Sequence, residues 1–527
     1  MTASRKVEHA DEPVVLTPGV ASNALQTQAV RGSLWSLFST AGSLPVSLAS
    51  VVVAGRALGP GAFGQYSLYI FYVTVGLLVL DLGLSNSQTW AATAGRAADH
   101  ALLVRSLRGT MAWNCSKLPF ALIGGIWLLQ SQPGAAVLLC LGLIAQMLSQ
   151  GLSVAVTADR RYGALANISF TNTFVGSLGL CVAALETASP EWAIAGLWVG
   201  RIAAAPLFYI LTPKELRAPA LTPGSIRMDR ESVVFGGSSY ISSLLSTWVA
   251  SRSELVFLKR TGDSLAQGRF ALATTVAMRS TLLADALYGA LGIAMLAVRS
   301  ADGANFLRAF RRSLRLTTLL AMATSASATA AAALLAPPLF GRAFGAVVFP
   351  TAFLLQVALL RTAWQPLFSW VYSERVNRAL LMPSAVAVGV DLGLSLWLIP
   401  GRPFTGAIIA NGSSSLVFLF VLAATASLPP VAVRELVRCT ARLALVASVS
   451  TGALYLPIPG PLFIRAVVAT SFSLVLNIII LRFLPALFEP SELVSVRASI
   501  PSKLRPLFNL LIYPVDGRAD RFGRVAS

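Results

Sequence analysis

Charged residues, histidine and cysteine are all scarce in this sequence. Charged side chains make up 12% of its 527 residues, whereas a soluble domain typically carries about 25%, so the composition excludes a soluble globular chain. The two histidines and four cysteines include no CxxC pair and do not suggest a zinc site. There is no GxxxxGK[ST] loop either, which removes the ATP-binding motif of an ABC exporter. We therefore predict no metal, no cofactor and no catalytic residue.

Long apolar runs take the place of the missing charge. Hydrophobic residues make up 55% of the chain, and the runs repeatedly reach about 20 residues, the length that a helix needs to cross the hydrocarbon core of a bilayer. We predict an all-α polytopic membrane protein with about 14 transmembrane helices. The predicted spans are 32–54, 66–88, 109–130, 134–157, 164–185, 191–211, 233–257, 270–296, 313–336, 348–371, 379–400, 404–427, 439–457 and 462–484.

The net charge of +19 is spread over short loops and not gathered in one patch, which argues against a nucleic-acid partner. Lys and Arg concentrate in alternate loops, for example at Arg160 and Arg161 and again at Lys214 and Arg217. Cytoplasmic loops carry the excess of basic residues in membrane proteins. The alternation predicts a multi-pass protein of the cytoplasmic membrane with both termini in the cytoplasm.

Two segments about two hundred residues apart resemble each other. They are residues 51–68 and 255–272, and each leads to an aspartate within a predicted span. One ungapped offset aligns Arg56 with Arg260, Gly64 with Gly268, Leu68 with Leu272 and Asp81 with Asp285. Membrane proteins built from two related halves commonly hold a substrate between the halves and move it across the bilayer.

The polar, proline-rich segment 212–231 is the longest interruption between predicted spans, and we place the boundary between the halves there. The predicted organisation is a cytoplasmic N-terminal segment 1–31, a six-helix lobe 32–211, a cytoplasmic linker 212–231, a second six-helix lobe 232–427, an appended helix pair 428–485 and a basic cytoplasmic tail 486–527.

Three stretches carry a resemblance to a known family. They are Ala54–Tyr66 (AGRALGPGAFGQY) followed by Asp81-Leu-Gly-Leu-Ser, Arg252-Ser-Glu254 with the glycine-containing loop up to Phe270, and Asp391–Pro400 followed by Gly406-Ala407. In these stretches the sequence resembles the Wzx-like polysaccharide flippases of the multidrug/oligosaccharidyl-lipid/polysaccharide exporter superfamily. The resemblance covers about residues 30–485.

This resemblance implies two six-helix lobes forming a V around a central cavity. The implied cargo is an oligosaccharide repeat unit linked to polyprenyl pyrophosphate, turned from the cytoplasmic to the outer leaflet by alternating access for polysaccharide biosynthesis and export. Implied partners are the lipid-linked oligosaccharide, membrane lipids, and a polymerase and glycosyltransferases of the same pathway. Without an ATP-binding motif, the driving force is expected to be an ion gradient, the membrane potential or the substrate gradient.

Ionisable side chains within spans are costly unless they face protein or water, so each is a functional candidate. The basic candidates for binding the pyrophosphate are Arg279, Arg201, Arg361, Arg252 and Lys117. Arginine binds phosphate oxygens through bidentate hydrogen bonds. We favour Arg279, which lies about 13 Å along its predicted helix from the outer end at 1.5 Å per residue.

The acidic candidates are Asp391, Asp81, Asp285 and Glu254. One interpretation is a site for a coupling ion or proton. The other is structural, with the acids tying neighbouring helices together or neutralising the basic side chains in buried pairs. Asp81 and Asp285 lie towards the inner ends of their predicted spans, which favours the structural role for both. Residues two apart on a helix point in different directions, so Arg252 and Glu254 need partners on other helices.

Three other functions fit parts of the pattern. A cation-coupled multidrug exporter of the same superfamily would require an acidic cavity, whereas five basic residues stand against four acidic ones in the spans. A peptidoglycan-precursor flippase would share both the fourteen helices and a cationic cavity. A membrane-embedded glycosyltransferase or polymerase would need acidic catalytic residues or a large outer loop, and no predicted outer loop exceeds about a dozen residues.

Overall fold

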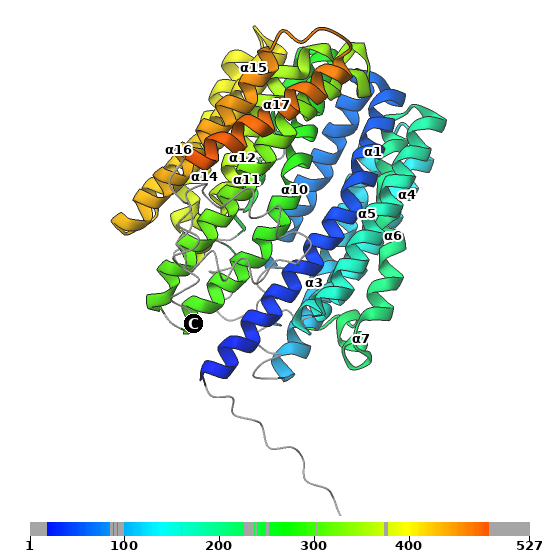
Figure 1. Cartoon of the computed structure of the whole chain (residues 1–527). Helices are drawn as coiled ribbons and strands as arrows, with labels where there is room; N and C mark the ends of the chain where they lie inside the picture. Colours follow the sequence, from blue (N-terminus) through cyan, green and yellow to red (C-terminus); the bar gives the residue numbers. More distant parts are fainter. Residues whose placement is uncertain are drawn as a thin grey trace, which may run out of the picture.

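Figure 1 shows the computed structural model of the chain, which describes residues 18–84, 88, 92, 100–159, 161–225, 237, 240–241, 243–248, 252–301, 303–373 and 378–483. Every regular element in these ranges is a helix. In chain order they are α1 (Pro18–Asp81), α3 (His100–Leu128), α4 (Pro133–Ala158), α5 (Tyr162–Thr187), α6 (Pro190–Leu211), α7 (Lys214–Leu221), α9 (Glu254–Thr261), α10 (Ser264–Ala301), α11 (Gly303–Phe340), η1 (Arg342–Val347), α12 (Val348–Ala363), α13 (Gln365–Ser373), α14 (Arg378–Leu398), α15 (Pro403–Thr425), α16 (Pro430–Gly452), η2 (Ala453–Tyr455) and α17 (Leu462–Phe483).

The predicted all-α polytopic fold is confirmed. Nine helical segments of the described chain are long and apolar enough to cross a membrane. Seven predicted spans agree with α3, α4, α5, α6, α14, α15 and α17 to within a few residues at most ends. Ten of the 25 residues in the predicted span 233–257 lie outside the described residues, as do residues 85–87 of the span 66–88.

The first two predicted spans belong to one element, α1, which reverses direction at Gly59. Gly59 has φ 68° and ψ 175°, a combination that a residue with a Cβ adopts only with strain. Pro60 follows and cannot donate a backbone hydrogen bond. The reversal divides α1 into two arms, and it lies at the end of the bundle opposite the start of the chain (Figure 1). We call the end where α1 begins the proximal end, and the end of the Gly59 reversal the distal end.

The predicted span 348–371 agrees with the membrane-length segment Arg342–Val371. Within it, Trp364 separates α12 from α13, and its indole Nε1 donates to Thr440 Oγ1 at 2.9 Å. One predicted start is different. The span predicted to start at 439 instead starts at Pro430 as α16. Its early arginines had suggested a loop, but proline is favoured in the first turn of a helix and long arginine side chains can extend to the interface.

The predicted linker 212–231 contains a helix, α7, and not only loop. Arg217 of α7 donates to the carbonyl oxygens of Thr212 and Ile210 at 3.0 and 2.7 Å. These carbonyls lie at the end of α6, where intrahelical donors run out. A cation there also interacts favourably with the helix dipole, so α7 caps α6.

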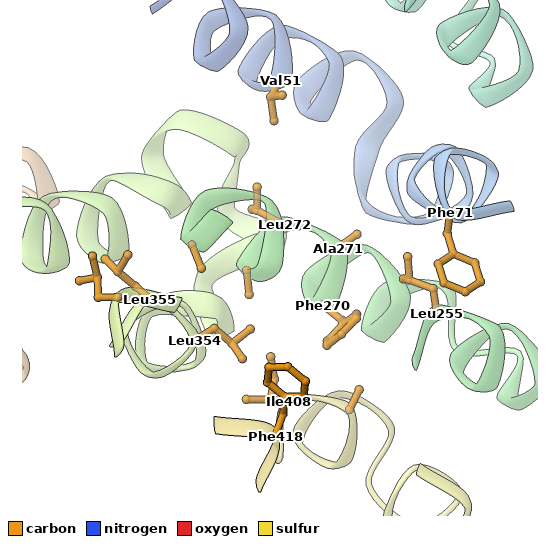
Figure 2. Packing of buried hydrophobic residues seen from close by; sticks show 14 of the residues in the cluster. Val51, Phe71, Leu255, Phe270, Ala271, Leu272, Leu354, Leu355, Ile408 and Phe418 are labelled. Carbon is orange, nitrogen blue, oxygen red and sulfur yellow. The ribbon is translucent and has the colours of Figure 1, made fainter. Parts of the chain in front are cut away.

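The helices of the two sequence halves lie on opposite sides of the molecule (Figure 1). They meet mainly where α1 packs against α10, with smaller contacts from α1 to α9 and α11. One buried hydrophobic cluster crosses this boundary. In Figure 2, Val51 of α1 lies opposite Leu272 of α10, and Phe71 of α1 lies beside Leu255 of α9. Helices α16 and α17 pack mainly on α11.

Candidate functional site

At the distal end the two halves touch through glycines that are equivalent in the repeat. A Cβ on Gly64 would lie 2.8 Å from the backbone nitrogen of Gly268, and a Cβ on Gly268 would collide with the carbonyl oxygen of Pro60. Only the absence of both side chains allows α1 and α10 to approach this closely, as in other small-residue contacts between membrane helices. The backbones of the two halves therefore touch at the distal end, and we call this contact the distal closure.

Arg56 of α1 adds a polar contact across the same boundary. Its guanidinium donates to the carbonyl oxygens of Leu339 and, at 2.7 Å, Pro338. Both carbonyls belong to the last turn of α11, where the helix dipole favours a cation. The repeat alignment pairs Arg56 with Arg260, and no local pattern in the sequence indicates that Arg56 meets a helix end 282 residues away.

Between the halves, Arg252 and Arg279 lie close enough to repel each other, and Tyr66 of α1 interacts electrostatically with both. Arg252 precedes α9 and has φ 70°, a left-handed conformation that is uncommon for a residue with a side chain. Its guanidinium contacts the sulfur of Met278 at 3.9 Å. Both arginines are partly exposed. The structure therefore brings together two of the five predicted basic residues at the boundary between the halves.

Glu254 and Asp391 form a buried pair of carboxyl groups. Both side chains are 0% exposed, and they lie against each other, with Asn411 beside Glu254. Ser253 Oγ donates to Asp391 Oδ2 at 2.7 Å. Within the described chain, neither oxygen of Glu254 has a hydrogen-bond partner in good geometry. Two carboxylates in direct contact cannot both be charged unless a cation compensates their charge. The pair of Glu254 and Asp391 can therefore hold a proton or a small cation.

The pair has limited ligands for a metal ion. Among the described residues there is no group of three His, Cys, Asp or Glu side chains that could hold one. The nearby neutral oxygens come from Ser253 and Asn411. Such a set offers oxygen ligands and two carboxyl charges at most, which suits a proton or a monovalent cation.

Asp81 makes a buried ion pair in the first half. Lys117 Nζ lies 2.7 Å from Asp81 Oδ1 and also donates to Gln150 Oε1 at 3.2 Å. Lys117 is 4% and Asp81 15% exposed. Trp113 Nε1 donates to the Asp81 carbonyl oxygen at 3.0 Å. These contacts join α1, α3 and α4.

Asp285, the repeat equivalent of Asp81, also joins several helices. Its carboxylate accepts hydrogen bonds from Thr281 and Thr362 at 3.0 Å and from Gln365 at 2.5 Å. Arg361, which is exposed, adds an electrostatic attraction. α10 runs from Ser264 to Ala301, so Asp285 lies 16 residues before its end.

The two halves differ here because of the residues that follow each aspartate. After Asp81, Leu82 and Gly83 have φ values of 47° and 72° and end α1. The residues after Asp285 are Ala286 and Leu287, which favour a helix more than glycine does. The second helix therefore continues past its aspartate.

Arg201 stands apart from the other cations. It lies in the middle of α6, partly exposed, with its guanidinium carbon 5.9 Å from the centroid of the Trp198 ring. Neighbouring Gly196 and Gly200 pack against Gly179 and Gly176 of α5, so α5 and α6 cross closely on another side of α6. Arg201 is therefore separate from the group formed by Arg252, Arg279 and Tyr66.

Sequence reasoning missed three contributors to these groups. Tyr66, Ser253 and Asn411 are uncharged, and only the fold places them beside the arginines and carboxyl groups. Ser253 lies between Arg252 and Glu254 in the stretch that carries the family resemblance. Tyr66 ends the first of those stretches, so the resemblance was an available signal for Tyr66 and Ser253 but not for Asn411.

Solved structures share this fold at low sequence identity. A structure of the lipid II flippase MurJ in an inward closed conformation has a TM-score of 0.54 and 9% identity, covering 86% of this chain and 99% of that one. An outward-facing multidrug resistance MATE family transporter of the MOP superfamily has a TM-score of 0.53 and 13% identity, covering 80% of this chain and 96% of that one. A MOP superfamily transporter from Pyrococcus furiosus has a TM-score of 0.50 and 15% identity, again covering 80% of this chain and 96% of that one.

No family model matches the sequence, and a search of curated proteins finds no match. At these identities the structural comparisons establish the fold alone. The chain is a multi-pass membrane protein with the helical fold shared by the MATE transporters and MurJ.

Proposed function

We propose that the protein is a flippase for a polyprenyl-pyrophosphate-linked oligosaccharide, and that Arg252 and Arg279 hold the pyrophosphate between the two halves. The observation that carries this proposal is the meeting of two partly exposed arginines beside Tyr66 at that boundary. Two cations held close together repel, so an arrangement of this kind gains most from an anion with several oxygens. A pyrophosphate has this chemistry.

The neighbours in fold support a transporter but leave the cargo open. One is described as a lipid II flippase and another as a multidrug transporter. The P. furiosus transporter is described as having a binding pocket of reversed polarity. The sign of the charge between the halves is therefore the property to compare among proteins of this fold, and here we assign it as positive.

In the same proposal, Glu254 and Asp391 couple transport to an ion gradient by exchanging a proton or a monovalent cation. The proximal end faces the cytoplasm, so the distal closure blocks the outer side. Arg361 and Arg201 are secondary candidates for contacts with the cargo, and Lys117 is assigned to its ion pair with Asp81. Delivery of the cargo to polymerases and transferases of the same pathway also belongs to the proposal.

A multidrug exporter is the second candidate, and the buried pair of Glu254 and Asp391 is the observation that favours it. A cationic drug would be attracted to a carboxyl pair when that pair is ionised. Both side chains are fully buried, however, so a drug could reach them only after a rearrangement. A peptidoglycan-precursor flippase would use the arginines in the same way as the leading proposal.

Mass spectrometry of polyprenyl-linked glycans from a strain lacking this protein tests the proposal. We expect a complete lipid-linked repeat unit to accumulate, and to disappear on expression of the wild type but not of Arg279→Ala. An unchanged lipid pool with new sensitivity to cationic drugs would identify a drug exporter. Accumulation of the peptidoglycan precursor would assign the cargo to that pathway, and an incomplete glycan would point to a transferase.

A further inference from the structure

Positive charge is concentrated at the distal end, around the contact between the two halves. Three segments meet there: residues 55–65 of α1, residues 256–269 of α9 and α10, and residues 337–347 of α11 and η1. They contain one acidic residue, Asp263, and five basic residues, which we call the distal cluster: Arg56, Lys259, Arg260, Arg269 and Arg342. None of the five makes an ion pair within the described chain.

The end of α11 brings three members of the cluster together. Arg56 of the first half donates to the Pro338 carbonyl oxygen at 2.7 Å. Arg269 of the second half donates to the Ala343 carbonyl oxygen at 2.9 Å. Arg342 lies between these two carbonyls in the chain and is exposed. A helix C-terminus is equivalent to about half a negative charge, so it compensates three cations only in part.

The other two members lie along the boundary between the halves. Lys259 and Arg260 are exposed in the last turn of α9. Arg260 interacts electrostatically with Tyr72, an exposed residue of α1 in the other half. α9 begins at Glu254, which follows Arg252 closely in the chain, and Arg260 lies about 9 Å further along the helix at 1.5 Å per residue. The distal cluster therefore continues outward from the arginines that we assign to the pyrophosphate.

Asp263 does not neutralise the cluster. Its Oδ1 accepts a hydrogen bond from the backbone nitrogen of Ala266 at 2.8 Å, so this carboxylate caps the first turn of α10. Basic residues normally concentrate in the cytoplasmic loops of membrane proteins, and with the proximal end in the cytoplasm, as proposed, the distal cluster lies on the opposite side. Cations gathered in this way raise the local concentration of anions. The cluster is thus placed to meet an anionic group at the outer end of the boundary between the halves.

We propose that the distal cluster binds a glycan with carboxylate groups, and hence that the cargo is an acidic oligosaccharide. Arginine and lysine bind carboxylates through charge-assisted hydrogen bonds. A chain of acidic sugars offers several carboxylates, which can engage several members of the cluster at once. The inference rests on the proposed flippase function, because the sugars of the cargo reach this face only when they are turned outward.

An anionic lipid is the competing occupant, because Leu265 and Leu339 are also exposed in these segments. The single phosphate of such a lipid would engage fewer of the five cations, which come from both halves. Arg56 and Arg269 are already held by carbonyl oxygens. The members that meet the glycan first are therefore the three exposed ones of the second half, Lys259, Arg260 and Arg342.

Isothermal titration calorimetry of the purified full-length protein with a short oligogalacturonate tests this site. Each of its sugars carries a carboxylate, and a neutral malto-oligosaccharide of the same length is the matched ligand. We expect the acidic oligosaccharide to bind, the neutral one not to bind, and added salt to weaken the binding. The variant with Lys259→Gln and Arg342→Gln should bind at least about tenfold more weakly. The control is Arg105→Gln, which removes an exposed arginine near the start of α3 and should bind as the wild type does.

Four results would overturn the proposal. They are equal binding of the two oligosaccharides, equal weakening by Arg105→Gln, displacement of the oligogalacturonate by an equal concentration of phosphatidylglycerol, which would assign the cluster to a lipid, and displacement by an equal concentration of inorganic phosphate, which would indicate a site for any anion. Should the double variant not fold, Lys259→Gln alone replaces it, because this side chain is exposed. That variant should still bind severalfold more weakly.

The glycan that accumulates in a strain lacking the protein separates this inference from the proposed function. We expect the accumulated lipid-linked repeat unit to contain at least one carboxylated sugar. A complete but neutral repeat unit would leave the flippase function in place and overturn the inference. An unchanged lipid pool, with oligogalacturonate still bound as expected, would overturn the flippase function and leave the binding site in place.

Discussion

The two halves of the molecule treat their buried charges differently. In the first half, Asp81 is neutralised by Lys117 at 2.7 Å. In the second half, Glu254 and Asp391 lie against each other, and Arg252 and Arg279 repel each other nearby. Opposite charges are paired in one half, while like groups are held together in the other. Like groups held together gain stability when a ligand of opposite charge arrives.

The repeat shows where the difference arises. The offset that aligns Asp81 with Asp285 places Ser50 where the second half has Glu254, and Val75 where it has Arg279. The aspartate that joins helices is therefore present in both halves, and the groups suited to binding a cation or a pyrophosphate are present only in the second. The duplicated scaffold and the binding groups are separate features of this sequence.

The largest effect should come from breaking the pair in the first half. Asp81→Asn leaves the buried ammonium of Lys117 without its counter-charge, which we expect to lower the free energy of unfolding by about 3–5 kcal/mol. An unfolding titration of the purified protein measures this change in the free energy of unfolding. The control is Asp159→Asn, whose partner Arg161 is 50% exposed and which should cost less than about 1 kcal/mol. Equal losses of stability in the two variants would show that the buried pair of Asp81 and Lys117 contributes no more than an exposed ion pair.

Closure of the distal end is the next feature to break. Gly268→Val would force the two halves apart there, at a cost of at least about 3 kcal/mol for the closed arrangement. Cysteines at positions 61 and 264, where a Cβ on Gly61 would lie 3.3 Å from Ser264 Cβ, should crosslink in the parent and not with Gly268→Val. The control is Gly124→Val, at a glycine with open space around its Cβ position, which should leave the crosslink intact. A crosslink that still forms in the Gly268→Val variant would contradict the predicted closure of the distal end.

Arginines of the two halves should contribute unequally to transport. Arg279→Ala should slow translocation of the lipid-linked glycan in proteoliposomes by roughly 10–100-fold, since hydrogen bonds between charged groups are worth about 1.5–3 kcal/mol. Arg201→Ala should slow it less than about threefold, because Arg201 lies over Trp198 and away from the paired arginines. Equal losses would mean that both halves hold the cargo.

The smallest effect on stability should come from Glu254→Gln. Its amide can donate to Asp391 and removes the conflict between two carboxyl groups, so unfolding should change by less than about 1 kcal/mol. The same variant should make translocation insensitive to an imposed pH or sodium gradient. Destabilisation as large as that of Asp81→Asn would show instead that Glu254 is charged and paired.

Sequence reasoning reached the spans, the repeat and the ionisable residues because each leaves a local pattern. It did not reach the partners. Lys117 is 36 residues from Asp81, and Ser253 is 138 residues from Asp391. Which side chains meet across such separations depends on how each helix is rotated about its axis, and packing sets that rotation. The early start of α16 was missed because arginines within a helix resemble those of a loop in composition.

The contact between Arg56 and the end of α11 has one further consequence. Each group in it can be hydrated when the contact separates, so water replaces the lost hydrogen bonds and the net difference is only about 1 kcal/mol per bond. An apolar seal would instead expose hydrocarbon to water on every separation. A contact made by one guanidinium and two carbonyl oxygens can thus hold the two halves together in one state and still separate at low energetic cost.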